Sequence, residues 1–205
     1  MFFRKHTPQE STGTFLLVGL GNPGREYENT RHNIGFLAID QIAFKWGVTV
    51  GKYKHKSVYG EYRFGDKKII LVKPQTFMNL SGGAVRSYFQ FFKPPLSQLL
   101  IIFDDLDLPF GAIRIRKEGG SSGQKGMKSI IQQLGTEDFP RMRVGIGRPP
   151  GRMDTADFIL KKFKSSENQD LEFVLGKCAD AVECFIENGI DAAMNRFNGG
   201  TLENE

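Results

Sequence analysis

The sequence is short of several features, and each shortage excludes a class of protein. Only two of its 205 residues are cysteines, Cys178 and Cys184, too few for a disulfide framework and wrongly spaced for a zinc site. The longest apolar run covers residues 99–103, far below the roughly 20 residues that span a bilayer. The polar segment 1–13 lacks the hydrophobic stretch of a signal peptide. We therefore expect a soluble, cytoplasmic protein with no membrane partner.

What the sequence does contain is typical of a globular protein. Hydrophobic residues make up 40% and charged residues 25%, which argues against a fibrous or disordered chain. A chain of this length forms one domain, or two small ones at most. We expect a flexible N-terminal extension over residues 1–13, one domain over 14–198, and a flexible tail over 199–205.

The charge is unevenly distributed along the chain. The formal net charge is +5, yet segments 114–128 and 141–152 each carry +4, and segment 165–205 has nine acids against two bases, a net charge of −7. A solvated charged surface accounts for such segments, and so does a face that binds a polyanion such as nucleic acid. Composition alone leaves both interpretations open.

The hydrophobic pattern alternates between strand-like and helix-like segments. A single three-layer α/β domain with a twisted mixed β-sheet flanked by helices is therefore expected. The predicted strands are 14–20, 57–64, 67–73, 98–103, 112–116 and 142–146, and the predicted helices are 33–46, 80–92, 127–134, 167–187 and 190–197.

A glycine motif follows the first predicted strand. Residues 19–24, GLGNPG, match the dinucleotide fingerprint G-x-G-x-x-G. However, Pro23 lacks the backbone N–H that a pyrophosphate needs, and the next helical pattern begins about nine residues later. An NADP-dependent enzyme stays open as an alternative because Lys52 and Lys54 suit a 2′-phosphate. Asn22 stands where α/β sheets place their ligands.

A second glycine-rich segment, residues 119–126, precedes a predicted helix. It fails the phosphate-loop spacing, because Gln124 stands where that motif has glycine and Gly126 follows Lys125. Such a segment is either a flexible loop or a loop that a ligand approaches closely.

Acidic side chains close the strand over 98–103. Asp104, Asp105 and Asp107 suit Mg²⁺, but the sequence offers no further acidic cluster to complete a metal site. One of these carboxylates can instead orient His32, which lies at a helix start, where a histidine serves as a packing residue or a general base. Covalent catalysis has no support, since no G-x-S-x-G elbow occurs.

Taken together, the motifs resemble the bacterial-type peptidyl-tRNA hydrolase family, and the resemblance covers residues 15–197. The segments that carry it occur in the order and at the spacing of the family. They are VGLGNPGREYENTRHNIGF (18–36), KPQTFMNLSG (73–82), DDLDLPFG (104–111), GGSSGQKGMKSI (119–130) and RMRVGIGRPPG (141–151).

The resemblance implies an enzyme that hydrolyses the ester between a peptide and the 3′ end of tRNA, which recycles tRNA after abortive translation. It implies that His32 is the general base, that Asp104 orients it, and that Asn22 positions the ester. It also implies a monomer whose partner is peptidyl-tRNA and not DNA, with no cofactor and no metal.

The resemblance further implies how the substrate is held. Met78 and Asn79 match residues that bind the peptide, and Tyr27 lies near the same pocket in the family. Arg116 and Arg143, with Arg114 beside them, match basic residues that bind the tRNA backbone.

One departure from the family concerns the second glycine loop. Lys125 stands where the family usually has asparagine, and Gln124 where it often has histidine. Lys125 either strengthens RNA binding, stabilises the developing oxyanion, or weakens the enzyme. In the last case the protein resembles the non-hydrolytic plant relatives that bind RNA and help to splice chloroplast introns.

Overall fold

The structure is a computed structural model that describes residues 13–199. Most of the predicted N-terminal extension and tail therefore lies outside the described residues. The elements are β1 (Thr14–Gly19), α1 (Ile34–Lys45), β2 (Lys52–Lys54), β3 (Ser57–Phe64), β4 (Lys67–Pro74), α2 (Ser81–Phe92), β5 (Leu99–Asp105), β6 (Ile113–Arg116), α3 (Lys125–Leu134), β7 (Arg141–Gly145), α4 (Thr155–Ile159) and α5 (Asn168–Phe197), with short 3-10 turns η1 (Arg25–Tyr27), η2 (Arg31–Asn33), η3 (Met78–Leu80), η4 (Leu96–Gln98) and η5 (Ser165–Glu167) between them.

The strands form one mixed sheet in the order β2-β3-β4-β1-β5-β7-β6. β4, β1, β5 and β7 are parallel to one another, whereas β2, β3 and β6 add antiparallel pairs at the two edges. The predicted strands β3 and β4 form an antiparallel hairpin, and Gly65 in its turn has a φ of 62°, which glycine adopts without strain. The prediction of a mixed sheet is thus confirmed.

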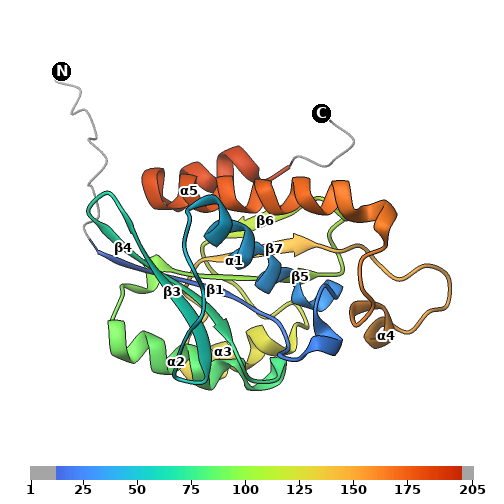
Figure 1. The fold of residues 1–205 in the computed structure, drawn as a ribbon, viewed down its shortest axis with the longest axis horizontal. Helices are drawn as coiled ribbons and strands as arrows, with labels where there is room; N and C mark the ends of the chain where they lie inside the picture. The colour runs from blue at the N-terminus through green and yellow to red at the C-terminus, as the bar shows by residue number, and fades with distance from the viewer. Residues whose placement is uncertain (1–12, 200–205) are drawn as a thin grey trace.

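Helices cover both faces of the sheet, which confirms the predicted three layers. α1 and α5 lie on one face, and α2 and α3 on the other (Figure 1). Successive residues of a strand point to opposite faces. Leu17 of β1 therefore belongs to the core under α1 and α5, whereas Leu16 and Val18 belong to the core under α2 and α3. No helix within residues 13–199 is long and apolar enough to cross a membrane.

The chain differs from the predicted pattern at short or polar elements. β2 is a three-residue strand with the sequence KYK, and α4 has only five residues; neither was predicted from hydrophobic periodicity. α5 runs from Asn168 to Phe197, but Gly189 interrupts it with a non-helical φ of 83° and ψ of 175°. The two predicted C-terminal helices therefore meet at this glycine.

The first glycine motif brings β1 and α1 together. A Cβ atom at Gly19 would lie 2.0 Å from the carbonyl oxygen of Gly35, and one at Gly21 would lie 2.7 Å from the ring of Phe36. Because α1 begins only at Ile34, the glycines do not lead directly into a helix as the dinucleotide fingerprint requires. They permit close packing of a strand on a helix, and the structure gives no support to the NADP alternative.

Candidate active site

A cleft of about 730 Å³ opens where three parallel strands end. Asn22 follows β1, Met78 follows β4, and Asp104 lies at the end of β5. The carboxyl ends of parallel strands meet at one edge of a sheet, the usual place for a ligand in this class of fold. His32, Asn79 and Lys125 also line the cleft. The structure therefore brings most of the predicted site residues into one cavity.

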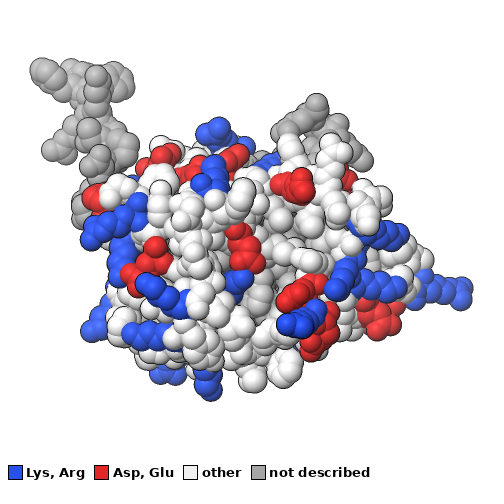
Figure 2. Space-filling model, viewed as in Figure 1, with Lys and Arg blue, Asp and Glu red and all other residues white. Residues whose placement is uncertain are grey.

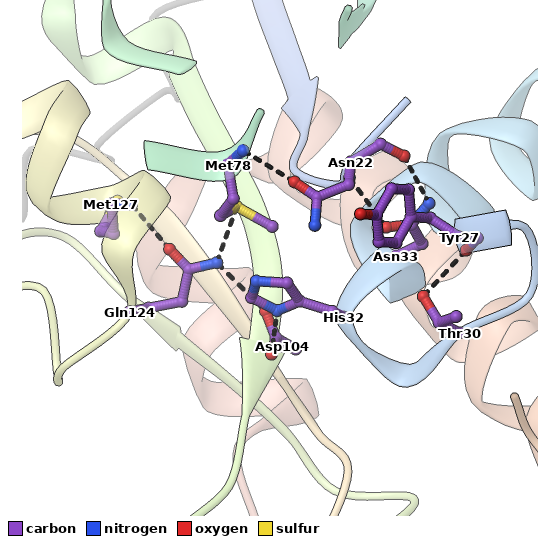
Figure 3. Close-up of polar contacts among 9 residues, drawn as sticks. All are labelled: Asn22, Tyr27, Thr30, His32, Asn33, Met78, Asp104, Gln124 and Met127. Carbon is purple, nitrogen blue, oxygen red and sulfur yellow. Dashed lines mark hydrogen bonds and ion pairs between the residues drawn. The ribbon is translucent and has the colours of Figure 1, made fainter. Parts of the chain in front are cut away.

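The central feature of the cleft is a pair formed by His32 and Asp104. Nδ1 of the imidazole lies 2.8 Å from Oδ2 of the carboxylate, and the two side chains are 10% and 4% exposed. A carboxylate only accepts hydrogen bonds, so Nδ1 carries the hydrogen and Nε2 keeps a free lone pair. The pair is drawn at the centre of Figure 3.

His32 is held in place by its neighbours in the chain. Thr30 donates its hydroxyl to the Tyr27 carbonyl at 2.8 Å. The buried Arg31 guanidinium pairs with Glu167 at 2.6 Å and donates to the Lys162 carbonyl at 2.8 Å. Turn η2 is thus fixed by the two residues that precede the histidine, which limits the movement of the imidazole.

Asn22 connects two strand ends through hydrogen bonds. Its Oδ1 accepts the backbone N–H of Met78 at 2.8 Å. Its own backbone N–H and carbonyl both bond to the Asn33 amide, at 2.8 and 2.9 Å. Because Oδ1 is engaged with the protein, Nδ2 is the part of the Asn22 amide that can donate to a ligand.

The acidic cluster at the end of β5 is divided among different partners. Asp105 pairs with Arg143, and Asp107 pairs with Arg148. Asp104 faces the histidine. Among residues 13–199, no group of three or more His, Cys, Asp or Glu side chains is arranged to hold a metal ion.

Arginines occupy one face of the β6–β7 ribbon. Arg114 lies opposite Arg143, and Arg116 lies opposite Arg141, so all four side chains point away from α5, whose side of the sheet receives Ile113 and Ile115. Arg114 and Arg116 are exposed, and Arg143 is half-buried beside Asp105. The predicted tRNA-binding arginines thus share one surface.

Arg141 differs from the other three arginines of this ribbon. It is only 2% exposed, and its guanidinium donates to the carbonyls of Gly120, Glu137 and Phe139. Burial lowers the pKa of Arg141 to about 10. These contacts tie the second glycine loop to β7, so Arg141 has a structural role.

The two remaining predicted residues, Lys125 and Tyr27, differ in their position relative to the cleft. Lys125 is exposed at the first position of α3 and lies on the rim of the cleft. Tyr27 is half-buried in η1 and is not among the residues that line the cleft. Its carbonyl accepts the Thr30 hydroxyl, so Tyr27 supports η2, the turn that carries His32, without lining the cleft.

One wall of the cleft was missed from the sequence. α4 and the residues that flank it contribute Asp154, Thr155, Ala156, Ile159 and Leu160. Asp154 begins this helix, since its carboxylate accepts the backbone N–H of Ala156 at 2.8 Å. An Asp followed three residues later by another acid is the available sequence signal for such a helix start. Figure 2 shows both basic and acidic side chains around this end of the molecule.

Comparison with known proteins finds the same family that the sequence motifs resemble. The family model described as Peptidyl-tRNA hydrolase matches residues 16–205. A Peptidyl-tRNA hydrolase of Thermoanaerobacter sp. is 52% identical over 90% of this chain and 100% of its own length, and that of Syntrophomonas wolfei is 49% identical over 89% and 99%.

Solved structures agree with the sequence relatives. The Arg119Gln mutant of peptidyl-tRNA hydrolase from Acinetobacter baumannii superposes with a TM-score of 0.86 at 32% identity, covering 94% of this chain and 98% of that one. These relatives, together with the shared fold, identify the chain as an enzyme of the hydrolase class. The chain belongs to the peptidyl-tRNA hydrolase family, as the resemblance predicted.

Proposed function

We propose that this protein hydrolyses the ester bond between peptide and tRNA in peptidyl-tRNA. The observation that carries the proposal is the buried His32–Asp104 pair, with Nδ1 and Oδ2 2.8 Å apart, in a cleft beside a surface of exposed arginines. Membership of the peptidyl-tRNA hydrolase family supports the same substrate.

The pair suits hydrolysis by a water molecule without a covalent intermediate. Nε2 of His32 removes a proton from water while the water oxygen attacks the ester carbonyl carbon. Asp104 fixes the tautomer and stabilises the imidazolium that forms. When the tetrahedral intermediate collapses, the carbonyl carbon releases the ribose oxygen, which takes the proton from the imidazolium. The products are a free carboxylic acid on the peptide and a free 3′ end on the tRNA.

The rest of the cleft is proposed to hold the peptide and the 3′ end of the tRNA. The Asn22 and Asn79 amides lie on its wall with Met78, and an amide can both donate to and accept from a peptide main chain of any sequence. Tyr27 supports the turn that holds His32, beside this wall, through the Thr30 contact. Lys125 on the rim adds a positive charge that attracts the RNA backbone.

The tRNA backbone is proposed to lie on the arginine face. Arg114 and Arg116 are exposed there, and Arg143 is held by Asp105. Guanidinium groups suit phosphate because their donors form a planar fork. We also propose that the protein acts as a monomer, as the family resemblance implies. We propose a cytoplasmic location, which a substrate that arises at ribosomes supports.

The test is release of a blocked peptide from tRNA. N-acetylated aminoacyl-tRNA is incubated with the wild-type protein and with His32→Asn, which keeps a polar side chain but removes the base. We expect rapid release by the wild type only. Release by the wild type no faster than by His32→Asn would overturn the proposal.

Lys125→Asn separates this proposal from a role in RNA binding alone. An active wild type, with the Lys125→Asn variant equally active, supports the enzyme and shows that lysine at this position does not weaken catalysis. A wild type that binds tRNA without hydrolysing it, while Lys125→Asn hydrolyses, identifies an RNA-binding protein in which lysine has replaced a residue needed for catalysis.

A further inference from the structure

Gln124 lies next to the His32–Asp104 pair, and its side chain contacts Asp104 directly. Its side-chain Nε2 donates to Oδ1 of Asp104 at 3.1 Å, whereas Oδ2 of the same carboxylate faces His32. Both oxygens of Asp104 therefore have a partner, one on η2 and the other at the start of α3 (Figure 3). Gln124 is 8% exposed, so water does not readily replace it.

The orientation of the Gln124 amide is determined by its surroundings. Oε1 accepts the backbone N–H of Met127 at 2.7 Å and so caps α3. A backbone N–H can only donate and the Asp104 carboxylate can only accept. The reversed amide would place donor against donor and acceptor against acceptor, so the N-cap directs Nε2 toward Asp104.

Packing around the amide leaves it little room to move. Nε2 also lies 3.1 Å from Sδ of Met78. A Cβ atom at Gly126 would lie 2.5 Å from that sulfur and 3.0 Å from Gln124 Oε1. Because Gly126 has no side chain, α3 can approach the side chains of Met78 and Gln124 closely. This close packing holds the Gln124 amide between Met78 and Asp104.

We propose that Gln124 is a positioning residue for the reaction, a role that rests on the proposed function. By bonding to Oδ1 it prevents rotation of the Asp104 carboxylate, so Oδ2 stays directed at Nδ1 of His32. It also links the glycine loop, whose Lys125 lies on the rim, to the catalytic pair. The Gln124 side chain would then transmit a movement of this loop on substrate binding to the Asp104 carboxylate.

The first test uses a substitution that keeps the helix cap. Gln124→Ser can accept the Met127 N–H, because serine is a good N-cap, but it is too short to reach Asp104. We expect kcat to fall between about 10-fold and 100-fold, the effect of losing a hydrogen bond to a charged group, with KM nearly unchanged. Gln124→His restores a ring N–H donor, and we expect it to recover most of the lost kcat.

The second test adds a charge and follows the pH profile. Gln124→Glu can still cap α3 but places a second carboxylate against Asp104, which favours the imidazolium form of His32. The other charged groups around the cleft are unchanged. They are Lys125, Asp154, the Asp105–Arg143 pair and the Asp107–Arg148 pair. We expect the acid limb of the kcat/KM profile to move up by about one pH unit.

A control variant tests whether an added charge elsewhere on α3 changes the pH profile. Gln132→Glu adds the same charge to an exposed position of α3, and we expect its profile to match the wild type. The proposal is overturned if Gln124→Ser keeps kcat within twofold, or if Gln124→Glu loses activity equally at all pH values. An inactive wild type would overturn the proposed function as well, whereas an active wild type with unaffected variants removes only the role of Gln124.

Discussion

Gly19 and Gly35 bring β1 into direct backbone contact with α1. A Cβ atom at Gly19 would lie 2.0 Å from the Gly35 carbonyl oxygen, and one at Gly35 would lie 2.4 Å from the carbonyl oxygen of Ile102 on β5. The first turn of α1 thus packs directly on the two central strands. Because His32 lies three residues before Gly35, this contact sets the distance between the histidine and the end of β5.

Gly35→Ala should therefore lower both stability and activity. The added methyl group meets backbone atoms, and overpacking of this kind costs about 1–3 kcal/mol. Urea unfolding measures the first effect and hydrolysis of blocked aminoacyl-tRNA the second. Gly83→Ala is the matched control, since nothing lies within 4 Å of its added Cβ, and replacing a helical glycine there should raise stability by about 0.5–1 kcal/mol. Equal stability of the two variants would contradict this account.

Asp104→Asn should reduce kcat by roughly 10²–10⁴-fold. The asparagine has nearly the same shape as the aspartate, but its amide permits the imidazole tautomer with hydrogen on Nε2, which cannot accept a proton from water. The measurement is the single-turnover rate of ester hydrolysis at saturating enzyme. Asp66→Asn, in the exposed turn between β3 and β4, should leave the rate unchanged. A loss below fivefold in Asp104→Asn would show that the carboxylate charge is unimportant.

Arg116→Ala should weaken tRNA binding and reduce its salt dependence. One phosphate contact contributes about one unit to the slope of log K against log salt. Fluorescence titration of a labelled tRNA at several salt concentrations gives that slope. Arg63→Ala removes an exposed arginine from β3, near the opposite edge of the sheet, and is expected to keep the wild-type slope. If both variants give the same slope, Arg116 does not contact phosphate.

Cys178 should make stability fall at alkaline pH. Burial raises the pKa of its thiol from 9.0 to about 12. Between these values the folded protein keeps the proton that the unfolded chain loses. The contribution is thus complete below about pH 9 and is lost as the pH rises toward 12. Urea unfolding between pH 8 and 10.5 measures the slope.

Cys178→Ala serves as the control for this pH dependence. We expect the variant to be less stable overall, because it leaves a small cavity, but to lose less stability over the same pH range. Thiol reagents should label Cys178 only after unfolding. Rapid labelling in the native protein, or identical pH slopes for the two proteins, would contradict the prediction.

The sequence predicted the sheet and most of the site because both depend on local pattern. Leu99 to Asp105 reads as a buried strand that ends in carboxylates, and Asn22 follows another buried strand. Polar groups at the ends of adjacent parallel strands converge regardless of the intervening loops. The pairing of His32 with Asp104 was therefore predictable once the family motifs had been found.

The remaining features depend on contacts between distant segments. α4 is too short for a periodic signal, and its place on the wall of the cleft follows from the tertiary path of residues 146–164. Gln124 was noted only as a departure from the family. That its amide reaches Asp104 depends on the close packing that Gly126 permits against Met78, which no local pattern reveals.

The two sides of the sheet also differ in charge. α5 carries six acids and two bases on one face, and Arg114 and Arg116 project from the other. These two groups contribute a dipole component along the sheet normal, reduced because Lys45 and Lys117 pair with three of the acids. A polyanion in solution exerts a torque on such a dipole before contact, turning the arginine face toward itself. RNA would then meet the protein already oriented, and fewer encounters would be lost to the wrong face.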